Sequence, residues 1–104
     1  MIFRRRRFAE VIERQLALFI DENEGLLREC EEALSRYNAA ERDEAEELYG
    51  DYVDVVESGT EILAEMRDRF ARTLDDAEAE AYEAEFNRTV AKRLPEFGLE
   101  IENR

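Results

Sequence analysis

The chain has 104 residues, of which 28 are acidic and 15 are basic, so its formal net charge is −13. This length corresponds to one domain, and an apolar fraction of 44% is enough for a packed core, which argues against a disordered chain. No run approaches the roughly 20 apolar residues of a membrane span, and the net charge disfavours nucleic acid as a partner. One proline and four glycines leave a composition that favours helices.

The chain begins with a basic segment, "MIFRRRRFAE", in which four arginines stand between Phe3 and Phe8. These arginines contribute +4, so the other residues together carry −17. A secretory or twin-arginine signal would continue into an uninterrupted apolar stretch, which Glu10 interrupts, so we expect no targeting signal. We expect residues 1–7 to form a basic arm or helix start, and the candidate interaction residues are Phe3, Arg4, Arg5, Arg6, Arg7 and Phe8.

The first apolar pattern predicts a helix over residues 8–37, with apolar residues at alternating steps of four and three. The rows consist of Ile12, Leu16, Phe19, Leu26, Cys30, Ala33 and Tyr37, with Ile20, Leu27 and Leu34 beside them. Both rows stay in phase across Asn23 and Gly25, which favours one continuous helix. Two helices joined near Gly25 are the alternative.

Asn23 occupies a step of this pattern where an apolar residue is expected. A polar residue at such a position can fix the register and the number of helices in an oligomer, at some cost in stability. Asn23 is therefore a candidate for oligomer register. The alternative is that Asn23 and Gly25 mark a kink or a break, and the sequence leaves both interpretations open.

The second pattern predicts a helix over residues 43–73, in which Arg69 is the one charged exception. The rows consist of Ala45, Leu48, Tyr52, Val55, Gly59, Ile62, Met66 and Thr73, with Tyr49, Val56, Leu63 and Phe70 beside them. Gly59 within these rows allows close approach of a neighbouring segment. Two pairs have the spacing of a capping box at its start, Asn38 with Glu41 and Asp43 with Glu46.

The third pattern predicts a shorter helix over residues 76–94, followed by a short acidic tail at 95–104. Asp75 and Glu78 have capping-box spacing, and Pro95 ends the helix because it disfavours helical geometry at residue 94. The buried face consists of Tyr82, Phe86, Val90 and Leu94.

These elements predict an all-α helical bundle, in which the two long helices form an antiparallel hairpin and the third helix packs on it. Residues 8–94 would form the bundle domain. At 1.5 Å per residue, the third helix covers only about two thirds of the groove along the hairpin. We therefore expect two copies to pair as a homodimer.

The residue inventory argues against catalysis. The chain has no histidine, so the commonest general base and metal ligand is missing, and Cys30 lacks a partner to activate it. The acidic residues fall outside the apolar rows, and the Glu-x-x-His pair of a di-iron bundle is absent. We predict no enzyme activity and no catalytic, cofactor-binding or metal-ligating residues.

The sequence thus predicts a non-enzymatic, cytoplasmic interaction or structural protein that acts through its helical surfaces as a homodimer, with a further protein partner allowed. The single cysteine fits a reducing compartment. The alternatives are a carboxylate-based, ferritin-like metal-binding protein and an acidic regulator that binds a basic surface of a partner. Nucleic acid is disfavoured as a partner, and membrane contact through the basic arm is not the preferred interpretation.

Overall fold

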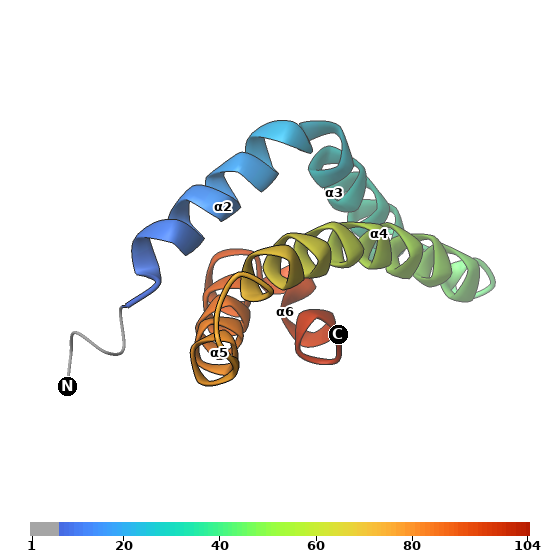
Figure 1. Cartoon of the computed structure of the whole chain (residues 1–104). Coiled ribbons are helices and arrows are strands. Elements are labelled where there is room, and N and C mark those ends of the chain that lie inside the picture. The colour runs from blue at the N-terminus through green and yellow to red at the C-terminus, as the bar shows by residue number, and fades with distance from the viewer. Residues whose placement is uncertain (1–6) are drawn as a thin grey trace.

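The computed structural model describes residues 7–104, which form helices and no strands (Figure 1). The helices are α2 (Ala9–Glu22), α3 (Glu24–Asn38), α4 (Ala45–Ala71), α5 (Asp76–Arg93) and α6 (Pro95–Glu102). The prediction of an all-α helical bundle is confirmed.

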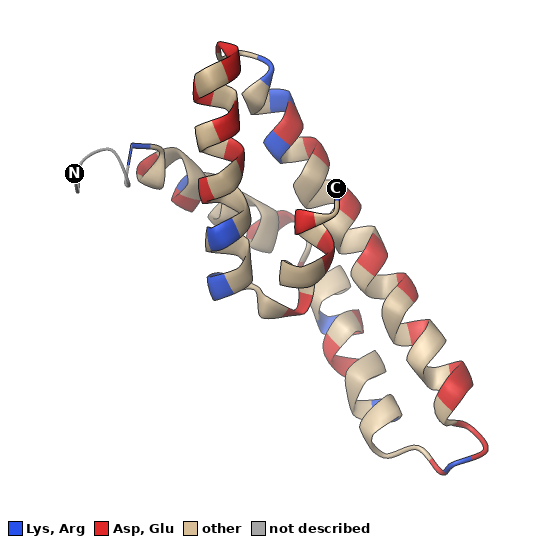
Figure 2. Ribbon diagram, turned by 90° about the horizontal axis from the view of Figure 1, so that it is seen from below, with Lys and Arg blue, Asp and Glu red and all other residues tan. Residues whose placement is uncertain are grey.

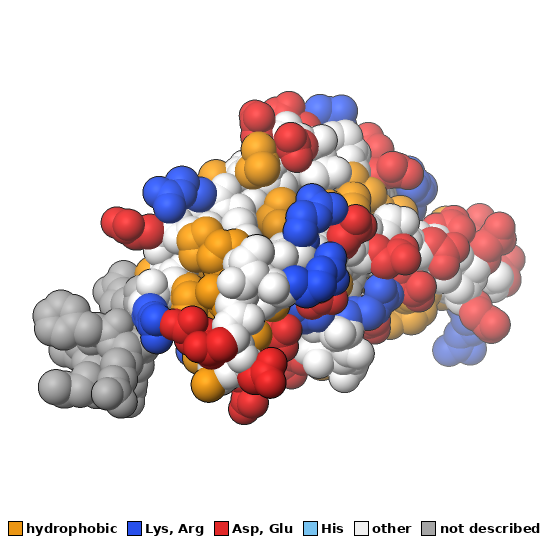
Figure 3. Space-filling view, viewed as in Figure 1, with side chains coloured by type: hydrophobic (Ala, Val, Ile, Leu, Met, Phe, Trp, Pro, Cys, Tyr) orange, Lys and Arg blue, Asp and Glu red, His pale blue; other side chains and the backbone are white. Residues whose placement is uncertain are grey.

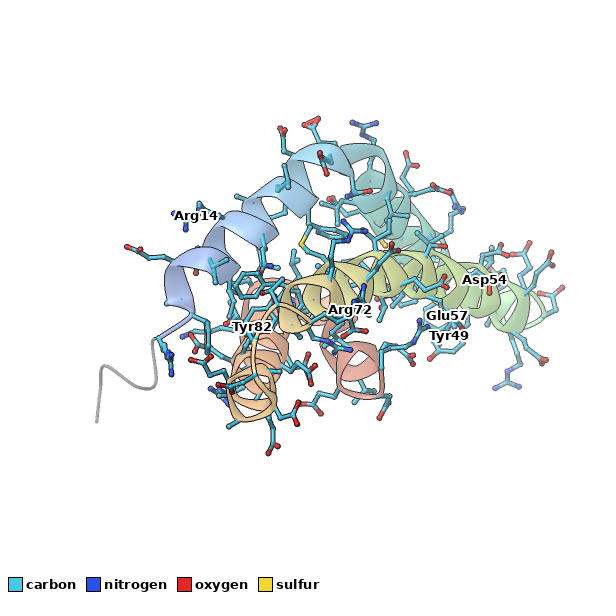
Figure 4. The ribbon with its side chains drawn as sticks, in the orientation of Figure 1. Arg14, Tyr49, Asp54, Glu57, Arg72 and Tyr82 are labelled. Carbon is cyan, nitrogen blue, oxygen red and sulfur yellow. The ribbon has the colours of Figure 1, made fainter. Side chains whose placement is uncertain are left out.

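The antiparallel hairpin of this fold is formed by α3 and α4, which are joined by residues 39–44. Its outer end projects beyond the other helices, so the molecule is elongated, with extents of 50 × 24 × 24 Å (Figure 1). Tyr49, Asp54 and Glu57 lie on this outer half of α4 (Figure 4). The core is therefore concentrated at the other end, where α2, α5 and α6 meet α4.

The prediction of one helix over residues 8–37 was wrong, because the helix is interrupted at Asn23. The backbone of Asn23 has φ −127° and ψ 34°, and its Nδ2 donates a hydrogen bond of 2.8 Å to the carbonyl oxygen of Phe19. The apolar rows continue on both sides of the break because each of the two helices has a buried face of its own with the same spacing. The first half, α2, packs on α5, whereas α3 packs on α4.

The helix starts were only partly predicted from capping patterns. Asp75 accepts a 2.8 Å hydrogen bond from the backbone N–H of Glu78, which confirms the cap of α5. Neither predicted capping box forms at the start of α4, whose first residue follows Glu44 without a side-chain cap. The sequence spacing was present there, but α4 begins later, after a turn in which the backbone N–H of Glu44 donates a 3.0 Å hydrogen bond to the carbonyl oxygen of Glu41.

The end of the chain is a helix rather than a simple tail. Leu94, with φ −134° and ψ 66°, leaves helical geometry as expected before Pro95, and Pro95 then begins α6. Phe97 and Ile101 are completely buried, whereas Leu99 is 78% exposed. The last helix is therefore part of the core.

Tyr82 lies at the centre of the core and is completely buried. Its ring centroid lies 5.5 Å from that of Phe8 and 4.8 Å from that of Phe70. Its hydroxyl donates a 2.8 Å hydrogen bond to Oε1 of Gln15, and burial raises the pKa of this hydroxyl to about 12. Tyr82 thus joins α2, α4 and α5.

Arg67 is a buried charged residue of α4, with 4% of its surface exposed. Its Nε donates to Oδ1 of Asp68 at 2.9 Å, and one terminal nitrogen donates to Asn87 and to the carbonyl oxygen of Ile101. The guanidinium therefore joins α4, α5 and α6. Arg69, the charged exception in the sequence pattern, lies on the surface instead.

Candidate functional site

An open apolar groove of about 490 Å³ lies between α2 and α4. Its lining consists of Gln15, Leu18 and Glu22 from α2, and of Ile62, Glu65, Met66, Arg69, Phe70 and Thr73 from α4. Figure 3 shows hydrophobic side chains gathered on this face between charged ones. Two helices that α3 separates along the chain thus contribute to one surface.

Leu18 and Ile62 are the exposed large apolar residues of this groove, with 49% and 37% of their surfaces accessible. Leu16 and Phe19 face the core of the bundle, and at 100° per residue Leu18 projects away from that buried face. Ile62 stands beside buried Leu63 in the same way. Exposed apolar residues that share one groove are typical of an interaction surface.

The rim of the groove carries charges of both signs. Glu65 accepts a 2.9 Å hydrogen bond from Arg69, and both side chains are about 70% exposed, so this pair contributes little to stability. Glu22 lies on the opposite rim. A second copy of the groove facing the first would therefore present acidic residues opposite basic ones.

The structure places the basic segment only in part. Arg7 pairs with Glu78 at the start of α5, and its guanidinium carbon lies 5.5 Å from the ring centroid of Phe8. Phe8 is buried, with 9% of its surface exposed, so its ring packs on the core of its own chain. The remaining candidates, Phe3 and Arg4 to Arg6, lie outside the described residues.

Asn23 lies between α2 and α3, where its side chain bonds the end of α2. This position corresponds to the break that the sequence left open as an alternative. A register role in an oligomer stays a prediction.

Cys30 is buried, with 3% of its surface exposed. Burial, and to a smaller extent the nearby carboxylates of Glu96, Glu29 and Glu31, raises the pKa of its thiol to about 11. The thiol is thus protonated at neutral pH and unsuited to nucleophilic attack. Within residues 7–104, no three acidic or cysteine side chains come together as a metal site.

Sequence reasoning placed Ile62 in an apolar row but left Leu18 outside both rows of its helix. The sequence did carry a signal for Leu18. It is a leucine close to Leu16 and Phe19 but outside the helix face that they share, which indicates a second apolar surface on the same helix. The partner of that position, α4, became evident only from the fold, because α2 and α4 are separated by α3 along the chain.

Comparisons of the chain with models of protein families, with curated proteins and with solved structures found no match. Among the described residues, every helix is too short or too polar to cross a lipid bilayer. The site must therefore be interpreted from its own geometry.

Proposed function

We propose that this protein is a non-enzymatic helical interaction protein that acts as a homodimer, with the groove between α2 and α4 as its dimer interface. The observation that supports this most is the exposure of Leu18 and Ile62 in one groove. A specific interface buries about 800 Å² on each partner and places apolar residues at its centre. The groove provides such a centre.

A second copy is the occupant that fits this surface best. In a two-fold dimer the same patch faces itself, so the patch must be complementary to its own charges. Arg69 and Glu22 stand on opposite rims of the groove and have opposite charges. A two-fold axis through the groove would bring Arg69 of one copy towards Glu22 of the other.

The oligomeric mass tests this proposal. At micromolar concentration, light scattering should give about twice the 12.3 kDa of one chain. Leu18→Glu and Ile62→Glu should each give single chains, because a carboxylate in the interface loses its hydration without a partner. Circular dichroism should show that both variants keep their helices.

Leu99→Glu is the matched control, because Leu99 is the most exposed large apolar residue described and lies on α6, outside the groove. It should remain dimeric. A mass of about 12.3 kDa for the natural protein would contradict the dimer. A dimer that persists in Leu18→Glu and Ile62→Glu would place the interface elsewhere, and Leu34→Glu would then test the exposed face of α3.

An acidic regulator is the second candidate function, and the charge of the hairpin favours it. Residues 41–61 contain nine acidic residues and one arginine, and all nine acidic side chains are exposed. Figure 2 shows the acidic residues along α4. A basic partner surface would be attracted to this end, with an affinity that falls as salt rises.

Replacement of Asp51, Asp54 and Glu57 by their amides tests this candidate. A partner from the native host that elutes from the natural protein with salt should not bind the variant. Retention of the same partner by the variant would contradict recognition through the acidic hairpin.

A further inference from the structure

A cavity of about 850 Å³, about as open to solvent as the groove, lies between α2 and α5 and shares no lining residue with the groove. Glu13 lines it from α2, and Glu85, Arg88, Lys92 and Arg93 line it from α5. Figure 2 shows that α5 is acidic towards its start and basic at its end. This polar cavity has no part in the proposed dimer interface.

Glu85 is the recessed carboxylate of this cavity, with only 9% of its surface exposed. Its side chain makes no hydrogen bond or ion pair with any residue that the structure describes. Thr89 donates a hydrogen bond to the backbone carbonyl oxygen of Glu85, not to its carboxylate. No buried side-chain oxygen among the described residues lacks a hydrogen-bond partner, so the carboxylate oxygens of Glu85 keep contact with solvent through the cavity. The cavity is therefore the place from which a cationic group can reach Glu85.

Two cations of the same cavity also lack a carboxylate partner among residues 7–104. Arg93 pairs with Glu13 and so joins α5 to α2, but Arg88 and Lys92 form no ion pair there. Arg88 and Lys92 follow Glu85 by three and seven residues, about one and two turns along α5. One carboxylate and two cations that form no ion pair among residues 7–104 therefore line one cavity.

This charge pattern selects against ligands of one sign. A simple anion would approach Arg88 and Lys92 but would also face the carboxylate of Glu85. A simple cation would be attracted to Glu85 and repelled by the two cations. A ligand with both charges satisfies all three side chains, and small-molecule sites have volumes of about 300–1,000 Å³.

We propose that the cavity between α2 and α5 binds a free amino acid, with its ammonium group at Glu85 and its carboxylate at Arg88 and Lys92. The ammonium forms a charge-assisted hydrogen bond with the Glu85 carboxylate, and the two cations bind the ligand carboxylate. Binding is independent of the dimer and of the hairpin.

The test is a thermal-shift screen of the full chain with each common L-amino acid at millimolar concentration, in a buffer without amines or zwitterions. At least one amino acid should raise the melting temperature, and calorimetry should give its dissociation constant. Its N-acetyl derivative lacks the cation and its amide lacks the carboxylate. Each should bind at least tenfold more weakly.

Three variants complete the test. Glu85→Gln and Arg88→Gln combined with Lys92→Gln should each weaken binding at least tenfold. Glu83→Gln is the matched control, because Glu83 lies on α5 outside the cavity lining and should bind as the natural chain does. Without ligand, Glu85→Gln should melt no lower than the natural protein, because it breaks no hydrogen bond or ion pair among the described residues.

The proposal fails if no amino acid changes the melting temperature, or if the N-acetyl derivative binds as tightly as the free amino acid. It also fails if Glu85→Gln binds normally. A large loss of stability in ligand-free Glu85→Gln would show that Glu85 has a structural partner within the chain, which would overturn the assignment.

Discussion

Two glycines of α4 differ in what surrounds them. A Cβ at Gly59 would lie 2.8 Å from Cζ of Phe97 and closer still to Cε1, whereas a Cβ at Gly50 would meet nothing within 4 Å. Phe97 is completely buried in α6, so its ring cannot withdraw without disturbing the core. Gly59 thus permits α6 to pack on α4.

Gly59→Ala should destabilise the protein by up to about 2 kcal/mol, measured by urea denaturation. Alanine gains roughly 1 kcal/mol of helix propensity, but the overpacked ring costs about 1–3 kcal/mol. Gly50→Ala is the control in the same helix and should stabilise by about 0.5–1 kcal/mol. Equal stabilisation by both variants would show that Phe97 is free to move.

Sequence reasoning at the residue scale depended on what the pattern could encode. It predicted the role of Gly59 and the buried face of α5, because apolar spacing and a missing side chain are both visible in one helix. It did not find Arg67, whose acceptors come from α5 and α6. It also did not find Glu85, because only the fold shows that this carboxylate is recessed in a cavity beside Arg88 and Lys92.

At the scale of elements, helix identity was predictable and helix continuity was not. Periodicity measures which residues share a face, and α2 and α3 each need a buried face with the same spacing. A break that preserves the phase is therefore invisible to periodicity. Asn23 carried the relevant signal, but the same residue type also serves to fix the register of an oligomer.

Asn23→Leu separates these two roles. In this structure the variant loses the bond to the Phe19 carbonyl, which would leave one backbone acceptor at the end of α2 unpaired. We expect a loss of about 1 kcal/mol in unfolding free energy with the oligomeric mass unchanged. Asn23→Asp is the conservative comparison, since it keeps the shape and loses the amide donor.

Thermal unfolding and light scattering measure both quantities. A higher melting temperature together with a mixture of oligomers would contradict the break as the main role of Asn23. That combination would assign it to the register of the dimer.

At the scale of the whole molecule, charge is distributed along its length. The start of α2 lies beside α5, and the acidic end of the hairpin lies at the opposite end, as both ribbon views show (Figures 1 and 2). The 27 residues of α4 separate the two ends by about 40 Å, at 1.5 Å per residue. Arg4 is three residues from Arg7, which is about 10 Å of extended chain.

Arg4 therefore cannot reach the outer acidic residues of its own hairpin, and contact with them requires a second copy. Within one chain, the acidic residues within reach are those near Glu78 at the start of α5. Arg7 already pairs with Glu78, which supports an acidic protein surface as the target of the basic segment. Polyanions are disfavoured, because the other residues carry −17.

Replacement of Arg4 to Arg7 by serine should lower the stability at low salt by about 1 kcal/mol, or roughly 4–8 °C in melting temperature. The change removes the pair with Glu78 and makes the net charge more negative, from −13 to −17, which increases repulsion within each copy and between copies. At about 0.5 M salt the difference should largely disappear, because screening then acts within a few ångströms. Lysine at all four positions is the control and should behave like the natural protein, since it keeps the charge. If the serine variant kept its stability and its mass at both salt concentrations but lost binding to anionic vesicles or duplex DNA, the target of the arginines would lie outside the protein.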